Sequence, residues 1–215
     1  MPVIPRVRRS AFAVMAAAVT AAVLAPAAPA SADPPEAPPV ATARKELAHL
    51  TIAAPHSMAG YSRAKFPHWI EQGNNCSTRE VVLKRDGQGV TTDAECRAVS
   101  GTWISHYDGK ILASAAGVDI DHVVPLANAW RSGADAWTTP RRKAFANDLS
   151  DPQLIAVSAA SNRAKGDQSP DQWKPPAASY WCTYARMWTH IKYLYALNVT
   201  QPEETALTTM LDTCH

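Results

Sequence analysis

The clearest periodic pattern of apolar residues lies in the last third of the chain. Large apolar side chains recur there at spacings of 3, 4, 3 and 4, at Trp181, Tyr184, Trp188, Ile191 and Tyr195. This spacing places them on one face of an α-helix. Such a face could stack on nucleic-acid bases, but packing into a core is the commoner use. A closing helix is predicted to begin at Pro202, with an apolar face made by Ala206, Leu207, Met210 and Leu211.

Shorter apolar runs predict the remaining elements. Strands are expected at 101–106, 154–157 and at the start of 118–126. Helices are expected at 41–50, 126–130, 139–146 and 158–165, with a further helical stretch around Tyr61, Phe66 and Trp69 and a helix starting at Ser169-Pro170. Residues 80–84 fit a strand or a helix. The mixture predicts an α+β fold that is mostly helical.

One predicted strand carries charge inside an apolar run. Residues 118–126 read VDIDHVVPL, and Asp119, Asp121 and His122 are its ionisable groups. Burying charge without a partner is costly. Either other residues pair with these groups or the groups take part in chemistry.

The first 32 residues have the pattern of an export signal. Three arginines precede an apolar stretch of 14 residues (11–24), and Ala30-Ser31-Ala32 fits the small-residue cleavage pattern. A membrane anchor is the alternative, but the apolar stretch is short for a bilayer. We therefore expect cleavage after Ala32 and a secreted protein without membrane attachment.

The remaining chain is predicted to be one domain. Residues 33–40 are proline-rich and indicate a flexible leader, and residues 41–215 suit a single domain with a hydrophobic core. Removing the signal leaves 18 basic and 19 acidic residues, because it contains three arginines and no acids. This balance excludes a protein that coats polyanions through its net charge, so nucleic acid would have to bind a local patch.

The four cysteines all follow the predicted signal, at Cys76, Cys96, Cys182 and Cys214. An even number in an exported chain indicates two disulfides with three possible pairings. We favour the sequence-local pairs Cys76–Cys96 and Cys182–Cys214 over free core thiols. No pair has CxxC spacing, which argues against a zinc ribbon.

A candidate site follows if the strands at 118–122 and 154–157 pair and the helix at 158–165 packs on them. In such a ββα unit Asp121 and Asn162 could face each other across a small gap. Their oxygens would suit Mg²⁺ or another hard cation that keeps water and phosphate as further ligands. His122, as a neutral imidazole, could take a proton from water. These residues predict a minimal phosphodiesterase.

The residues DIDHVVPL, FAND and LIAVSAASNRAKGD, taken in this order, resemble the HNH (ββα-metal or His-Me finger) nuclease motif. The wider chain resembles exported HNH-family proteins related to the C-terminal domain of GmrSD-type restriction endonucleases. The resemblance covers roughly residues 60–215, and the ββα-metal motif lies at about 117–167.

The resemblance implies roles for individual residues. Asp121 and Asn162 would bind the metal, most simply Mg²⁺, with Mn²⁺ as an alternative, although Asn162 stands where many relatives have histidine. His122 would be the general base. Asn147 would brace the loop that holds the base, although a helix-ending turn is the plainer interpretation. Arg163 and Lys165 would contact phosphate.

Other charged residues near the motif have open roles. Arg79 and Arg131 are candidate phosphate contacts, but salt bridges, or cation–π packing for Arg131, are equally good explanations. Asp119 could pair with either arginine or line the metal site. His106 could act directly in the site.

The expected function is therefore secreted, metal-dependent hydrolysis of DNA phosphodiester bonds with low sequence specificity, with RNA as a second substrate. The alternatives are a phosphoesterase acting on small or cell-envelope substrates and a non-catalytic binding protein on the same scaffold. No obligate partner protein is indicated.

Overall fold

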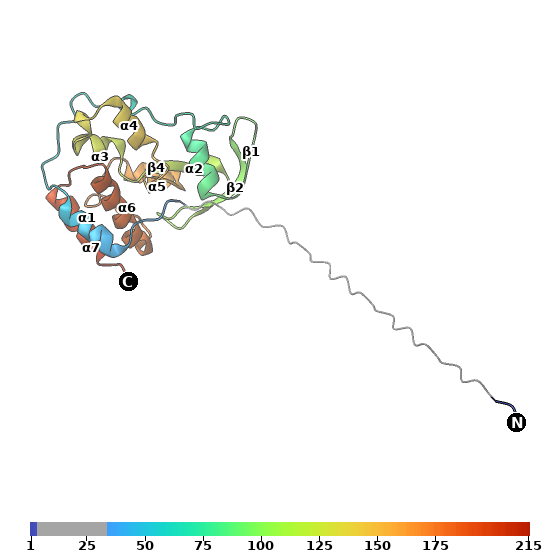
Figure 1. Cartoon of the computed structure of the whole chain (residues 1–215). Coiled ribbons are helices and arrows are strands. Elements are labelled where there is room, and N and C mark those ends of the chain that lie inside the picture. Colours follow the sequence, from blue (N-terminus) through green and yellow to red (C-terminus); the bar gives the residue numbers. More distant parts are fainter. Residues whose placement is uncertain (4–33) are drawn as a thin grey trace. The chain divides into compact units, whose positions relative to one another are not determined.

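The computed structural model describes residues 1–3 and 34–215 (Figure 1). The predicted signal peptide lies almost entirely outside the described residues. Residues 31–215 belong to one compact unit, and the description below concerns that unit. Across residues 1–3 and 34–215, no helix is long and apolar enough to cross a membrane.

The unit combines helices with two small sheets. Its helices are α1 (Val40–His49), α2 (Thr78–Asp86), α3 (Leu126–Arg131), α4 (Thr139–Ala146), α5 (Ala159–Lys165), α6 (Trp181–Leu194) and α7 (Gln201–Leu211). Its strands are β1 (Gln88–Thr92), β2 (Ala98–Ile104), β3 (Ile111–Leu112), β4 (Val118–His122) and β5 (Leu154–Ser158). The predicted α+β class is confirmed.

Strands β4 and β5 form an antiparallel pair, and α5 follows β5 directly. The register places Val118 opposite Ser158 and His122 opposite Leu154. The Ser158 side chain accepts a hydrogen bond from the Ser161 backbone N–H and so caps the start of α5. The predicted ββα unit is therefore present.

The β4-β5 strand pair lies between two hydrophobic clusters. Val118 and Ile120 pack with α2 and Trp103 in one cluster, whereas Ile155 and Val157 belong to the other. Because side chains alternate along a strand, the acids of β4 lie on the same face as Ile155 and Val157. This alternation turns Asp119 and Asp121 toward α5.

Sheet β1-β2-β3 and α2 flank the β4-β5 pair on the side of the first cluster. The Trp103 indole N–H donates to the Leu83 carbonyl at 2.8 Å and so ties β2 to α2. A disulfide joins Cys76, before α2, to Cys96, before β2, as predicted.

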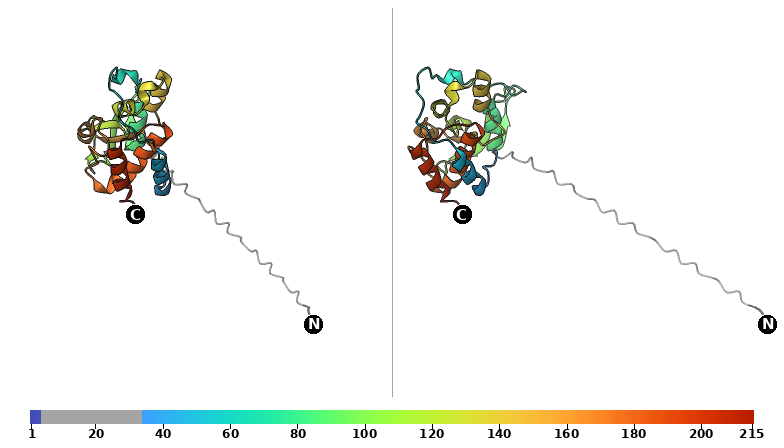
Figure 2. Two further views of the ribbon diagram at one scale, coloured as in Figure 1. Left: turned by 90° about the vertical axis from the view of Figure 1, so that its left-hand side faces the viewer. Right: turned by 60° about the vertical axis from the view of Figure 1, so that its left-hand side comes forward.

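Helices α1, α6 and α7 lie side by side (Figure 2). Tyr184, Trp188 and Ile191 are fully buried, so the aromatic face of α6 serves the core. A capping box formed by Thr200 and Glu203 begins α7. The predicted disulfide Cys182–Cys214 joins the first turn of α6 to the chain just beyond α7.

Two predicted helices are wrong. The stretch around Tyr61 to Trp69 is a loop with one short 3₁₀ turn at Arg63–Lys65, and Ser169-Pro170 lies in a turn. In both stretches side chains pack against other elements without forming repeated backbone bonds: Phe66, for example, packs against Trp130 and Phe145. Residues 80–84, left open between strand and helix, belong to α2.

Candidate active site

Asp121 lies near the end of β4 and is only 4% exposed. The Lys165 ammonium, which is fully buried, donates to Oδ1 at 2.9 Å and to Oδ2 at 2.7 Å. The Tyr107 hydroxyl donates to Oδ2 at 2.6 Å. Lys165 also donates to the His122 carbonyl at 2.8 Å. The carboxylate is therefore held by two buried donors from α5 and from the turn before β3.

The burial of this network opposes charge on each of its members. Burial raises the pKa of Asp121 and lowers the pKa of Lys165, while their attraction acts in the opposite direction on both. Burial and the Asp121 charge raise the pKa of Tyr107 well above 10.0. Tyr107 therefore stays protonated and can always donate to the carboxylate.

His122 is 5% exposed, and one of its ring nitrogens is fixed. Nε2 lies 3.0 Å from the carbonyl oxygen of Ala146, which can only accept, so Nε2 carries the proton. Burial lowers the pKa of His122 to about 3, which leaves the ring neutral near pH 7. Nδ1 then keeps its lone pair, and no hydrogen-bond partner for it is found in the described part of the chain. This is the tautomer that a general base requires.

Asn147 ends α4, immediately after the carbonyl that holds His122. Its Nδ2 donates to the Pro67 carbonyl at 2.8 Å, and its Oδ1 accepts from the Ile70 N–H at 3.1 Å. The side chain thus fastens the loop 67–70 to the end of α4. The Trp69 ring in this loop lies 5.3 Å from the His122 ring. Asn147 occupies the position that a brace for the histidine would need.

Asn162, on α5, reaches back to β4. Its Nδ2 donates to Asp119 Oδ2 at 3.2 Å, and the Arg163 guanidinium lies 4.0 Å from the same carboxylate. The bond to Asp119 uses the amide nitrogen and fixes the plane of the amide, and within the described residues Asn162 Oδ1 makes no hydrogen bond and remains an available acceptor. Asp119 therefore positions Asn162.

Asp121, His122 and Asn162 line one pocket of about 210 Å³. Tyr61 and Arg63, from the loop before α2, line it as well. The pocket thus brings together a carboxylate, an imidazole, an amide and a guanidinium. This set can bind a phosphate and accept a proton from water.

The predicted metal site can be tested against these contacts. Within the described residues, no group of three or more His, Cys, Asp or Glu side chains could hold a metal ion. An ionised carboxylate has about four lone-pair positions, and the bonds from Lys165 and Tyr107 leave one of them, on Asp121 Oδ1. Together with Asn162 Oδ1, that gives two protein oxygens in one pocket. The set fits a hard cation that keeps most of its water ligands.

The four predicted phosphate-binding cations are all close to carboxylates. Lys165 is buried against Asp121 and has no route to a substrate. Arg163 lies by Asp119, and Arg79 lies 3.2 Å from Glu80 on α2. The predicted phosphate contact of Lys165 is therefore wrong, because its ammonium group is buried and holds Asp121 instead.

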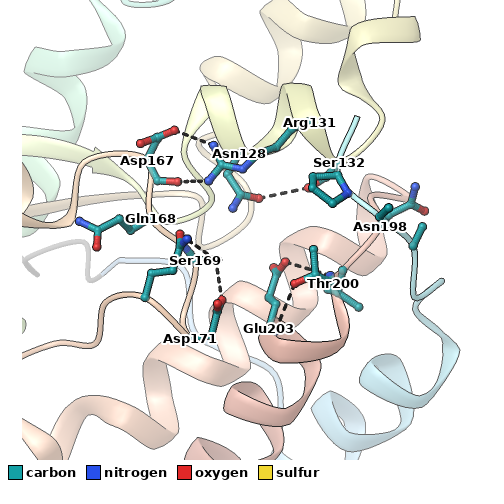
Figure 3. A pocket seen from close by; sticks show the side chains of 15 residues that line it. Asn128, Arg131, Ser132, Asp167, Gln168, Ser169, Asp171, Asn198, Thr200 and Glu203 are labelled. Atoms are coloured by element: carbon teal, nitrogen blue, oxygen red, sulfur yellow. Dashed lines mark hydrogen bonds and ion pairs between the residues drawn. The ribbon is translucent and has the colours of Figure 1, made fainter. Parts of the chain in front are cut away.

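Arg131 is engaged with Asp167, 2.6 Å away, at the edge of a second, larger pocket of about 450 Å³ (Figure 3). Asp167 lines both pockets, whereas Arg131 lines only the larger one. Inside the larger pocket, amide and hydroxyl side chains such as Asn128 and Ser132 hydrogen-bond to one another (Figure 3).

Two functional candidates had not been identified from the sequence. For Tyr107, no local signal in the sequence shows that its hydroxyl reaches Asp121. Arg63 lies in a segment that was predicted to be helical, far from the motif in sequence. His106, next to Tyr107, stacks on Tyr180 at 5.2 Å and does not line the pocket of His122.

In this ββα unit the antiparallel strands β4 and β5 are followed by α5, and His122 lies at the end of β4 in the same pocket as Asp121 and Asn162. The family model described as "GmrSD restriction endonucleases, C-terminal domain" matches residues 77–210. The chain belongs to this family, which indicates a nuclease-related role.

One relative extends the match toward the N-terminus. A protein of Arthroderma benhamiae with the name "Uncharacterized secreted protein" is 57% identical over 177 residues, which cover 82% of this chain and 87% of that protein. No solved structure matches the chain.

Proposed function

We propose that the protein is a secreted, metal-dependent endonuclease that hydrolyses the phosphodiester bonds of nucleic acids, with DNA as the expected substrate and RNA as a second one. The observation that carries the proposal is His122, a neutral histidine with a fixed tautomer in the same pocket as Asp121 and Asn162. A family of restriction endonuclease domains supports the reaction class. Because the net charge of the chain is near neutral and its sequence contains no recognisable base-reading module, we expect low sequence specificity.

In the proposed reaction, His122 Nδ1 takes a proton from a water molecule, which attacks phosphorus opposite the leaving 3′ oxygen. The bond between phosphorus and the 3′ oxygen breaks, and the 3′ oxygen takes up a proton from solvent water. Lys165 and Tyr107 keep Asp121 oriented, and Asp119 keeps Asn162 oriented. Arg63 offsets phosphate charge at the pocket. A divalent cation held by Asp121 and Asn162 would supply Lewis-acid stabilisation of the charge that develops on the phosphate oxygens.

Secretion is proposed on three grounds. The relative from Arthroderma benhamiae is named as a secreted protein. All four cysteines form disulfides, which persist in oxidising surroundings. The first 32 residues have the pattern of an export signal. N-terminal sequencing of the protein recovered from culture medium should begin at Asp33.

The test of the reaction is plasmid cleavage by the exported protein with its disulfides intact. Supercoiled DNA, single-stranded DNA and RNA are incubated with Mg²⁺, Mn²⁺ or EDTA. We expect cleavage that requires a metal and falls by roughly 10²–10⁴-fold in His122→Ala, since a general base contributes about that factor. His49→Ala, on the exposed face of α1, is the matched control and should cleave normally.

Two results would reject the proposal. If the folded wild-type protein cleaves none of the three substrates with either metal, the nuclease reading is wrong. If metal-dependent cleavage survives in His122→Ala, a different residue or a contaminating enzyme is responsible.

A further inference from the structure

A group of cations beside the candidate active site lacks the carboxylate partners that other cations have. Arg63, Lys65, Arg141 and Arg142 come from the 3₁₀ turn after Tyr61 and from α4. Within residues 1–3 and 34–215, none of them has a carboxylate oxygen within 4.0 Å. By contrast, Arg79, Arg131 and Lys165 each have one, at 3.2, 2.6 and 2.7 Å.

We call these four cations the basic ridge, and contacts in the structure link two of them, Lys65 and Arg142. Arg142 Nε donates to the Lys65 carbonyl at 3.0 Å. Lys65 Nζ lies 5.5 Å from the centre of the Trp130 ring, and the Arg142 guanidinium lies 5.7 Å from it. The 3₁₀ turn at Arg63–Lys65 and helix α4, which are far apart in sequence, thus bring their positive charges close to each other.

The basic ridge has two ends. At one end Arg63 lines the pocket of His122 and donates to His68 Nε2 at 3.2 Å. At the other end the Arg141 guanidinium lies over the Trp137 ring, 4.5 Å from its centre, and donates to the Tyr195 carbonyl at 2.7 Å. Half-buried aromatic rings, Tyr61 and Trp137, therefore accompany the charges along this surface.

An arrangement of this kind suits a nucleic-acid strand. Arginine and lysine contact phosphates without reading sequence, and partly exposed aromatic rings can stack on unpaired bases. The ridge leads to the pocket, so a strand lying on it would bring a phosphate to His122. Because the net charge of the chain is near neutral, attraction for a polyanion is expected to come from a local surface such as this one.

We propose that the basic ridge is the surface along which the nucleic-acid strand binds on its way into the active-site pocket, with Lys65 and Arg141 contacting phosphates beyond the cleaved one. This inference rests on the proposed function, since it assigns the substrate path of the same site. The predicted contacts from Arg79 and Arg131 are replaced by contacts from residues that have no carboxylate to neutralise them.

The test measures binding separately from cleavage. His122→Ala protein in EDTA is titrated, by fluorescence anisotropy at several salt concentrations, into a labelled single strand and a duplex of the same sequence. The ridge variant adds Lys65→Gln and Arg141→Gln, both at exposed positions. The matched control adds Lys45→Gln and Lys84→Gln, which are exposed on α1 and α2 and also lack a carboxylate within 4.0 Å in the described chain. Circular dichroism and thermal melting confirm that each protein is folded.

We expect the ridge variant to bind about tenfold more weakly at 0.1 M salt. The slope of log K against log salt should flatten by about 0.9 for each lost phosphate contact on the duplex and by about 0.7 on the single strand. The control should bind as the parent does. Equal losses in the two variants, or no loss in the ridge variant, would overturn the proposal.

Two further outcomes separate this proposal from the reaction itself. If the wild type cleaves DNA and the ridge variant binds like the control, the nuclease stands and the ridge is wrong. If the ridge variant loses DNA binding but the wild type never cleaves, the ridge stands and the proposed reaction is wrong. A loss seen with heparin or phosphatidylglycerol vesicles but not with nucleic acid would assign the ridge to another polyanion and overturn the proposal.

Discussion

Two fully buried lysines in this protein are paired with carboxylates near the same tryptophan. Lys165 lies 2.7 Å from Asp121, and Lys192 lies 3.1 Å from Glu203. Their ammonium groups lie 5.9 and 5.7 Å from the centre of the Trp188 ring. By burial, distance and aromatic contact, the two pairs are nearly equivalent.

The two pairs differ in what their carboxylates do next. Glu203 accepts the Trp188 indole N–H at 2.6 Å and completes the capping box at the start of α7. Asp121 keeps a free position on Oδ1 and borders His122 in the pocket. The Lys192 pair fastens helices to one another, whereas the Lys165 pair orients a carboxylate that lines the pocket of His122.

The comparison shows that a buried ion pair does not by itself mark a functional site. Burying two charges costs desolvation that their attraction only partly returns, so such a pair is weak evidence for stability as well. What distinguishes Asp121 is its neighbours. Variants of the two pairs should therefore differ in cleavage far more than in stability.

The largest expected effect comes from removing either lysine. Lys165→Met and Lys192→Met should each lower the free energy of unfolding by about 3–5 kcal/mol, because each leaves a buried carboxylate without its partner. Urea denaturation followed by tryptophan fluorescence measures this loss. Per folded molecule, Lys165→Met should also lose about 10–100-fold in plasmid cleavage, as typically follows loss of a residue that orients a ligand, and Lys192→Met should not. Equal cleavage by the two variants would contradict the distinction.

The next effect is a recovery of stability when the carboxylate of each pair is neutralised together with its lysine. Adding Glu203→Gln to Lys192→Met, or Asp121→Asn to Lys165→Met, removes the orphaned charge and should restore about 2 kcal/mol of unfolding free energy in each case. Cleavage should remain normal in the first double variant. It should be lost in the second, because the candidate metal ligand is no longer a carboxylate. A double variant at Asp121 and Lys165 that cleaves DNA would remove Asp121 from the mechanism.

A third carboxylate extends the comparison to pH. Burial alone would raise the pKa of Asp108, but hydrogen bonds from the Ser158 and Ser161 hydroxyls outweigh it and hold the pKa below 3.8. Since the folded state favours the charged form, the stabilisation is present above pH 3.8 and is lost as the pH falls through the lowered pKa. Asp108→Asn should cost about 2 kcal/mol at pH 7 and progressively less below pH 4. Urea unfolding at several pH values checks this, and a cost that grows in acid would contradict it.

The smallest effect concerns a surface pair. Arg79, whose side chain is 37% exposed, pairs with its neighbour Glu80. Arg79→Gln should change the free energy of unfolding by less than about 0.5 kcal/mol and leave cleavage within about twofold. Arg63→Gln, at the pocket, should lower cleavage roughly tenfold or more. If Arg79→Gln were the more damaging of the two, the substrate would lie on α2.

The local pattern of the sequence determined much of this protein. Regular apolar spacing is sufficient to place α6 and α7, and the apolar runs with the resemblance to the HNH motif led to the ββα unit that the structure contains. Sequence-local pairing of the cysteines is also confirmed. The helices depend on residues close together in the chain, where periodicity and capping act directly.

Only the tertiary structure decided which charged groups meet. The chain separates Tyr107 from Asp121 by 14 positions and Lys65 from Arg142 by 77, and no periodic signal spans such distances. Lys165 was expected to contact phosphate, yet it is fully buried at the end of α5 and paired with Asp121 of β4. Charge pairing depends on three-dimensional proximity and burial, because the energy of a charge depends on the partners and the solvent that the fold leaves around it.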